Sequence, residues 1–212
     1  MKVEIWSDYA CPFCYIGKRR FEKALEQLPF KEEIEVVFRS FELDPSSPKE
    51  VKSSMHEILA AKYGMSIEEA KAANERVSEQ AAGEGLVYRF DTMIPTNTFD
   101  AHRITRYAEK QGKAAEMTER LFKAYFTDSL HIGDPDTLIF LAQGVGLDGE
   151  EIRSMLASDA FGEEVRQDEQ FAAELGIRSV PFFVLDRKYA ISGAQPLEVF
   201  QNGLQQAWDQ QK

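Results

Sequence analysis

Cysteine is scarce in this chain: only two are present among 212 residues, and they stand three positions apart, at Cys11 and Cys14. Random placement would give that spacing in roughly one case in a hundred, so the spacing itself carries information. A structural disulfide between them would close a very short loop, which constrains the unfolded chain little. The pair therefore favours a redox site, with a metal site as the main alternative.

The sequence also lacks long apolar runs and an excess of positive charge. No window approaches the roughly 20 apolar residues that cross a bilayer, and Met1–Asp8 has no uninterrupted apolar stretch of the kind that a secretory signal needs. Lysine and arginine number 25 against 36 aspartate and glutamate residues, a formal net charge of -11. Such a charge repels nucleic acid and anionic membranes. We therefore expect a cytoplasmic protein with no nucleic-acid and no membrane partner, while nothing in the sequence indicates its oligomeric state.

The N-terminal part of the sequence carries a β-α-β pattern. Lys2–Ser7 alternates polar residues with large β-favouring ones and predicts a strand. Apolar residues at helical spacing follow Pro12, which suits the first position of a helix, and Pro29 marks the helix end. Ile34–Phe41 predicts a second strand, which completes a β-α-β unit.

The middle of the chain carries helical punctuation instead. Its helix-start signals are one capping box and two pairs of a polar residue with proline: Ser66 with Glu69, Ser47-Pro48 and Asp134-Pro135. The glycines that follow helical runs as terminators are Gly64, Gly112 and Gly176. Gly83–Thr96 has no helical periodicity and predicts a loop that could cover a site.

Strand signals return after Gly176. Val180–Leu185 and Tyr189–Ser192 predict two strands joined by a hairpin turn, and Pro196 opens a last helix. The order β-α-β, helices, β-β-α places the helical block inside a small α/β domain.

This order predicts an α/β fold with a large all-helical insertion between the second and third strands. We assign residues 1–47 and 177–212 to the α/β domain and residues 48–176 to the inserted helical domain. The sequence contains no internal repeat, low-complexity tract or flexible linker.

The segment Cys11-Pro12-Phe13-Cys14 lies at the first strand-to-helix junction. Cys11 falls at the helix N-cap, where unpaired N–H groups and the positive end of the helix dipole favour a thiolate, so we predict it to be the attacking sulfur. Cys14 lies one turn further and is expected to be more buried, which suits a thiol that resolves a mixed disulfide. Phe13 points outward at a helix start, and we assign Pro12 and Phe13 to substrate binding.

A second candidate element is Pro181, at the start of a predicted strand. An X-Pro bond can be cis, and a cis bond here would turn the backbone of Val180 toward whatever docks at the cysteines. We therefore place Pro181 in the site and assign Val180 to substrate binding. Position alone leaves the isomer of this bond open.

Five segments carry a family resemblance: Trp6–Lys18, Asn97–Arg103, Leu121–Phe126, Val180–Phe183 and Gly193–Gln195. They resemble the DsbA-like thioredoxin superfamily, most closely its FrnE-like branch, over almost the whole chain. The resemblance implies a thioredoxin-like fold with a helical insertion, Cys11 as nucleophile, Cys14 as resolving thiol and Pro181 as a cis proline. It also implies a protein dithiol-disulfide oxidoreductase or isomerase that acts on disulfide-bearing proteins or small molecules.

Two departures from that family shape the expectation. Periplasmic DsbA proteins carry histidine between their cysteines and enter by a signal peptide, whereas this chain has Pro12-Phe13 and no signal, so we expect a less oxidising site. Some FrnE-like proteins have a second cysteine pair near the C-terminus, and this sequence has none. In a reducing cytosol, reduction or isomerisation of disulfides is favoured over net oxidation.

Three other functions remain open from the sequence. A zinc site needs two further ligands, and a helix that starts directly at Cys11-Pro12 is unlike a zinc knuckle, so we predict no metal. A glutathione-dependent isomerase or transferase is the second, because hydroxychromene-carboxylate isomerases and kappa-class transferases resemble this architecture; they generally use serine at the position of Cys11. A non-catalytic binding module is the third. We predict no resident cofactor beyond the redox-active disulfide, with glutathione as a candidate co-substrate.

The remaining polar candidates are three histidines and one aspartate. His102 is expected to be a partly buried structural residue. His56 and His131 are expected at the surface without partners. Asp8 either accepts a proton at the cysteines or caps a turn, and the sequence leaves both open.

Overall fold

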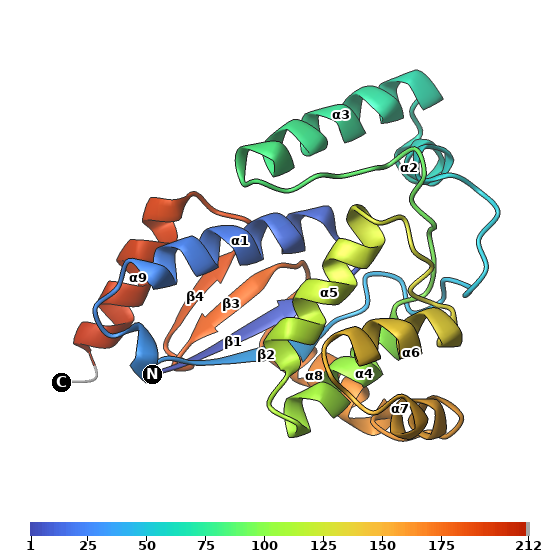
Figure 1. The fold of residues 1–212 in the computed structure, drawn as a ribbon. Coiled ribbons are helices and arrows are strands. Elements are labelled where there is room, and N and C mark those ends of the chain that lie inside the picture. The colour runs from blue at the N-terminus through green and yellow to red at the C-terminus, as the bar shows by residue number, and fades with distance from the viewer. Residues whose placement is uncertain (211–212) are drawn as a thin grey trace. The chain divides into compact units, whose positions relative to one another are not determined.

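The computed structural model describes residues 1–210, and within them one mixed sheet holds four strands in the order β2-β1-β3-β4 (Figure 1). The strands are β1 (Lys2–Ser7), β2 (Glu35–Ser40), β3 (Phe182–Leu185) and β4 (Tyr189–Ser192). β1 runs parallel to β2, whereas β3 is antiparallel to both of its neighbours. β1 is therefore a central strand, paired along both edges.

Helices connect the strands of this sheet, and a series of helices separates β2 from β3 along the chain. The crossover from β1 to β2 is α1 (Pro12–Glu26), and α9 (Leu197–Asp209) follows β4. Between β2 and β3 the chain forms α2 (Met55–Tyr63), α3 (Ile67–Gly83), α4 (Phe99–Lys110), α5 (Ala114–Phe126), α6 (Pro135–Gly144), α7 (Gly149–Leu156) and α8 (Gly162–Glu174). The predicted fold class, an α/β thioredoxin-like fold with a helical insertion between the second and third strands, is confirmed. Every helix of residues 1–210 is too short or too polar to cross a membrane.

The chain divides into two compact units. Met1–Leu43 together with Arg166–Lys212 forms one, called the sheet unit below, and Asp44–Val165 forms the other, called the helical unit. The sequence placed the second division after Gly176, which does follow the end of α8. The later part of α8 nevertheless falls in the sheet unit, because its side chains bond to the strands.

One face of the sheet packs on α1 and α9. The ring of Phe21 on α1 lies 5.5 Å from that of Phe183 on β3 and 6.1 Å from that of Phe200 on α9. All three rings are almost fully buried, and burying an aromatic ring of this size contributes roughly 1.5–3 kcal/mol. This packing fixes α1, and with it the cysteines at its start, against the sheet.

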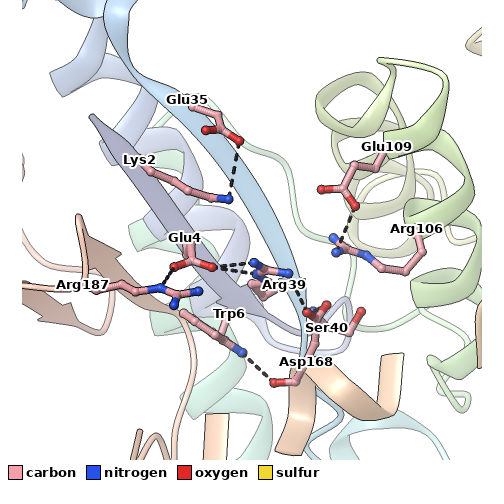
Figure 2. A network of polar contacts seen from close by, with 10 residues as sticks. All are labelled: Lys2, Glu4, Trp6, Glu35, Arg39, Ser40, Arg106, Glu109, Asp168 and Arg187. Atoms are coloured by element: carbon pink, nitrogen blue, oxygen red, sulfur yellow. Dashed lines mark hydrogen bonds and ion pairs between the residues drawn. The ribbon is translucent and has the colours of Figure 1, made fainter. Parts of the chain in front are cut away.

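The opposite face of the sheet carries buried charge. Side chains alternate along a strand, so Glu4 and Trp6 of β1 both point away from the phenylalanine core. Arg39 of β2 bonds to Glu4 and to Asp168 of α8, with Nη2–Oε1 and Nη1–Oδ1 distances of 2.5 Å and 3.0 Å (Figure 2). Trp6 Nε1 donates to the Asp168 carbonyl at 3.0 Å. These contacts hold the later part of α8 against the sheet.

Polar side chains cap the start of several helices of the helical unit, namely α2, α3, α6 and α7. The predicted capping box at Ser66 and Glu69 opens α3, and Asp134 caps α6 by accepting from the Thr137 N–H at 2.8 Å. Both contacts satisfy N–H groups that have no partner within their helix.

The prediction of a helix start at Ser47-Pro48 is wrong. Ser47 closes a turn, in which its N–H donates to the Asp44 carbonyl at 3.1 Å, and Pro48 follows outside any helix. The turn starts at Asp44-Pro45, an Asp-Pro pair of the kind that favours turn initiation. α2 begins later, with Ser54 as its N-cap.

Candidate active site

The two cysteines lie where β1 ends and α1 begins. Cys11 is the N-cap of α1 in an extended conformation, and Pro12 occupies the first helical position. The backbone between them is a tight turn, since Cys11 N donates to the Asp8 carbonyl and Cys14 N donates to the Cys11 carbonyl, both at 3.1 Å. The local geometry is therefore the strand-to-helix junction that the sequence predicts.

The two thiols differ in their surroundings. Both are buried and free in this structure, with 5% of Cys11 and 1% of Cys14 exposed. Burial raises the pKa of the Cys14 thiol well above its usual value, and the adjoining Cys11 thiol raises it further, although Ser7 and the Asp8 N–H act in the opposite direction. The raised pKa favours the protonated thiol of Cys14, which is the more buried of the two cysteines.

The peptide bond between Val180 and Pro181 is cis, as expected from its pairing with the cysteines and the family resemblance. The Val180 carbonyl accepts a long hydrogen bond from Cys11 Sγ at 3.5 Å. On the far side, the Pro181 carbonyl accepts from Gly193 N at 2.8 Å, which ties this turn to the end of β4. The structure therefore brings Cys11, Cys14, Val180 and Pro181 together.

The other two predicted site residues flank the sulfurs. Phe13 is 40% exposed, although both neighbouring cysteines are buried. Pro12 is partly exposed at the first position of α1. Both residues are accessible at the start of α1.

Asp8 caps the turn that holds the cysteines. Its carboxylate is buried and accepts from Ala10 N at 3.3 Å and from Leu43 N at 2.8 Å, while its own N–H donates to Cys14 Sγ at 3.5 Å. The structure thus favours the turn-capping role that the sequence left open.

Three residues close to the site were not singled out by sequence reasoning: Ser7, Gly17 and Arg20. Ser7 contacts the Cys14 thiol. Gly17 approaches Pro181, and Arg20 donates to the Ala194 carbonyl at 2.7 Å. Gly17 stands in the resemblance segment Trp6–Lys18, but no local pattern indicates what lies across from it.

The histidines lie in the helical unit. His102 is buried, in line with a structural role. The expectation for His56 is wrong, since this side chain is only 7% exposed and bonds to Asn74 at 3.0 Å and Asp91 at 2.9 Å. His131 also has partners, because its Nε2 lies 2.8 Å from the Lys49 carbonyl. Sequence reasoning missed these contacts because the partners lie 18 to 82 positions away.

The predicted loop Gly83–Thr96 lines a cavity within the helical unit. The cavity has a volume of about 280 Å³, and its wall combines His56, one side of α3 and the loop residues Tyr88–Thr92. Among residues 1–210 no group of three or more His, Cys, Asp or Glu side chains is arranged to hold a metal ion.

Comparison with known proteins agrees with this geometry. A family profile described as a DSBA-like thioredoxin domain matches residues 2–205. The crystal structure of SCO1869 from Streptomyces coelicolor, described as a probable DsbA oxidoreductase, is 48% identical with a TM-score of 0.96, over 100% of this chain and 92% of that chain. YwbO of Bacillus subtilis (strain 168) is 30% identical over 99% of this chain and 97% of its own length. A solved 2-hydroxychromene-2-carboxylate isomerase shares the fold, at 16% identity and a TM-score of 0.75 over 100% of this chain and 98% of that one. The chain belongs to the DSBA-like thioredoxin family.

Proposed function

We propose that this protein is a thiol–disulfide oxidoreductase in which Cys11 attacks a substrate disulfide and Cys14 resolves the mixed disulfide. The observation that carries the proposal is the unequal pair at the start of α1. Cys11 forms the helix N-cap beside the Val180 carbonyl, whereas Cys14 is almost fully buried and its pKa is raised. Only one of the two sulfurs is therefore suited to meet a substrate first.

The reaction consists of two exchanges. In the first, the Cys11 thiolate attacks one sulfur of the substrate disulfide, forms a bond to it and releases the other sulfur as a thiolate. In the second, the Cys14 sulfur attacks Cys11, the bond from Cys11 to the substrate breaks, and the Cys14 proton passes to a departing thiolate. The net result is one Cys11–Cys14 disulfide, one substrate thiol and one substrate thiolate that takes a proton from water, with two electrons passed to the substrate.

The raised pKa of Cys14 gives this order of events a physical reason. A protonated, buried thiol is a poor first nucleophile, because the thiolate is the attacking species. Once Cys11 carries the substrate, Cys14 is one helical turn away, and this proximity makes the resolving attack effectively intramolecular. Cys14 thus acts second in the sequence.

The substrate is proposed to dock on the backbone at Val180 and Pro181, with Phe13 and Pro12 flanking it. The Val180 carbonyl lies 3.5 Å from Cys11 Sγ, so a chain that contacts this backbone brings its sulfur near Cys11. The exposed ring of Phe13 offers an apolar contact next to the same sulfur. No resident cofactor is required, since the dithiol itself carries the electrons.

We place the protein in the cytoplasm, where the exchange runs toward reduction or isomerisation of protein or small-molecule disulfides. A glutathione pool can return the Cys11–Cys14 disulfide to the dithiol, which makes glutathione the proposed co-substrate. The alternative, a glutathione-dependent isomerase, draws on the fold shared with 2-hydroxychromene-2-carboxylate isomerase. The two functions predict different results, because turnover by a glutathione-dependent isomerase would survive loss of both cysteines.

The test combines a redox titration with two matched variants. We expect the wild-type pair to form one reversible two-electron disulfide in glutathione buffers, at a potential in the reducing part of the range of roughly -270 to -120 mV known for exchange proteins. Cys11→Ser should abolish reduction of a peptide disulfide, whereas Cys14→Ser should accumulate the mixed disulfide with Cys11, visible by mass spectrometry. If no Cys11–Cys14 disulfide forms, or if Cys11→Ser keeps its turnover, the proposed function is wrong.

A further inference from the structure

Helix α1 approaches the Pro181 turn more closely than a side chain allows. A Cβ atom added at Gly17 would lie 2.9 Å from Cγ of Pro181 and 3.4 Å from Cα of Ala194. The first distance is shorter than real Cβ atoms tolerate, and neither neighbour is the far end of a flexible side chain, since one belongs to a proline ring and the other to the backbone. Neither can rotate away, so this approach requires glycine.

Two hydrogen bonds tie the same segments together. Gly193 N donates to the Pro181 carbonyl at 2.8 Å, and Arg20 Nη1 donates to the carbonyl of Ala194 at 2.7 Å. Gly17 and Arg20 lie one turn apart on α1 and therefore on the same side of the helix. α1 thus holds the Pro181 turn both by packing and by a hydrogen bond.

The start of the same helix carries the attacking sulfur. Cys11 is the N-cap of α1, and its Sγ lies 3.5 Å from the carbonyl of Val180, the residue before Pro181. A short helix moves as one body. The contact of Gly17 with Pro181 and the contact of Cys11 with Val180 are therefore geometrically coupled. A shift of the Pro181 turn away from Gly17 must also change the gap at Cys11.

We propose that Gly17 is a positioning residue for disulfide exchange, which sets the distance between the backbone on which the substrate docks and the sulfur that attacks it. The inference rests on the proposed exchange function. A methyl group at position 17 pushes the Pro181 turn away from α1, and Val180 moves with it. A docked disulfide is then misaligned for attack, and a misplacement of about 1 Å can cost up to roughly a hundredfold in rate.

The test compares Gly17→Ala with a matched glycine of the same unit. A Cβ added at Gly203 on α9 would lie 2.8 Å from Cδ1 of Ile191, so it is equally crowded, but by the end of a flexible side chain and not by the Pro181 ring. Each substitution adds one methyl group to a helix and gains the same helix propensity. Gly203→Ala therefore controls for packing and stability.

Two rates are measured for each reduced protein: reduction of a peptide disulfide, which needs docking, and alkylation of Cys11 by iodoacetamide, which does not. For Gly17→Ala we expect the peptide rate constant to fall by roughly ten- to a hundredfold, while alkylation stays within about threefold of wild type. For Gly203→Ala we expect both rates to stay within about threefold. A merely structural role of Gly17 would not separate the two rates.

Three results would overturn the inference: an unchanged peptide rate in Gly17→Ala, an equal loss in both rates, or an equal loss in Gly203→Ala. If Gly17→Ala does not fold, Arg20→Met decides, because it removes the bond to Ala194 without adding volume; an unchanged peptide rate there overturns the inference. If the wild type is active and Gly17→Ala reduces the peptide at the wild-type rate, this inference is wrong but the proposed function stands. A wild type that is alkylated but reduces no disulfide refutes the proposed function, and the inference falls with it.

Discussion

The sheet unit and the helical unit provide examples of two kinds of polar contact, one between distant segments and one local. In the sheet unit, hydrogen bonds join segments far apart in the chain, as where Trp6 donates to the carbonyl of Asp168, 162 positions later. In the helical unit, several polar side chains cap the helix that they precede, as Asp134 does three residues before Thr137. Local bonds need little loop closure, whereas bonds between distant segments must offset the entropy of bringing those segments together.

The difference shows how a unit built from both ends of the chain remains whole. The strands β1 and β2 come from the N-terminal segment, and the later part of α8 returns after the entire helical unit. Asp168 bonds to Arg39 and also accepts from Ser40 N at 2.9 Å, so one side chain of α8 reaches both the side chain and the backbone of β2. Loss of a long-range ionic contact should therefore cost more than loss of a local cap.

The largest effect is expected for Glu4→Gln. Glu4 is 1% exposed and accepts from Arg39 and from Arg187 Nε at 3.2 Å. Removing its charge leaves Arg39 without its nearest counter-charge, and we expect the free energy of unfolding to fall by about 2–3 kcal/mol. The value lies below that of a fully buried pair because 21% of the Arg39 side chain is in water. Urea unfolding followed by circular dichroism measures it.

The same unfolding experiment at acid pH gives a second test of the role of Glu4. Burial alone would raise the pKa of Glu4, but the bonds from Arg39 and Arg187 outweigh it and hold the pKa below its usual 4.5. A lowered pKa gives stability that is fully present above pH 4.5 and is lost as the pH falls below it, so the gap between wild type and Glu4→Gln should shrink there. Glu26→Gln is the control, since its bond to Lys31 is exposed. An unfolding midpoint as low in Glu26→Gln as in Glu4→Gln would contradict the role of burial.

An intermediate effect is expected for His56→Ala in the helical unit. The histidine joins α2 to Asn74 of α3 and to Asp91 of the loop. Asp91 is 88% exposed, so its bond contributes little, but Asn74 is buried and loses a partner, at a cost of about 1–2 kcal/mol. Hydrogen exchange should become faster in α2 and α3, which the bond between His56 and Asn74 joins, with the reactivity of Cys11 unchanged. His131→Ala serves as the matched control variant. Equal losses of stability in both variants would contradict the expectation that the buried contact of His56 stabilises more than the more exposed contact of His131.

The residues of the site were easier to predict from the sequence than the long-range contacts that hold the helices and strands in place. Cys11, Cys14 and Pro181 are marked by local signals: a spacing of three, a helix start and a proline at a strand start. The contacts of Asp168 with β2 and of His56 with Asn74 join segments that no periodicity relates, so they could not be predicted. The second division of the chain was placed at Gly176 for the same reason, because a glycine marks the end of a helix but not the side chains that the helix buries.

The smallest effect is expected for the local cap Asp134→Ala. Asp134 accepts from the N–H and the hydroxyl of Thr137, both at 2.8 Å, and loss of such a cap costs about 1 kcal/mol. The bond from the Thr137 N–H lowers the pKa of Asp134 below its usual 3.8, so the cap stabilises fully above that pH and weakens below it. Asp136→Ala is the neighbouring control, because the Asp136 side chain is exposed and bonds to Arg153 at the surface. A loss in Asp134→Ala as large as that in Glu4→Gln would contradict the comparison, because a local cap would then stabilise the protein as much as a long-range ionic contact.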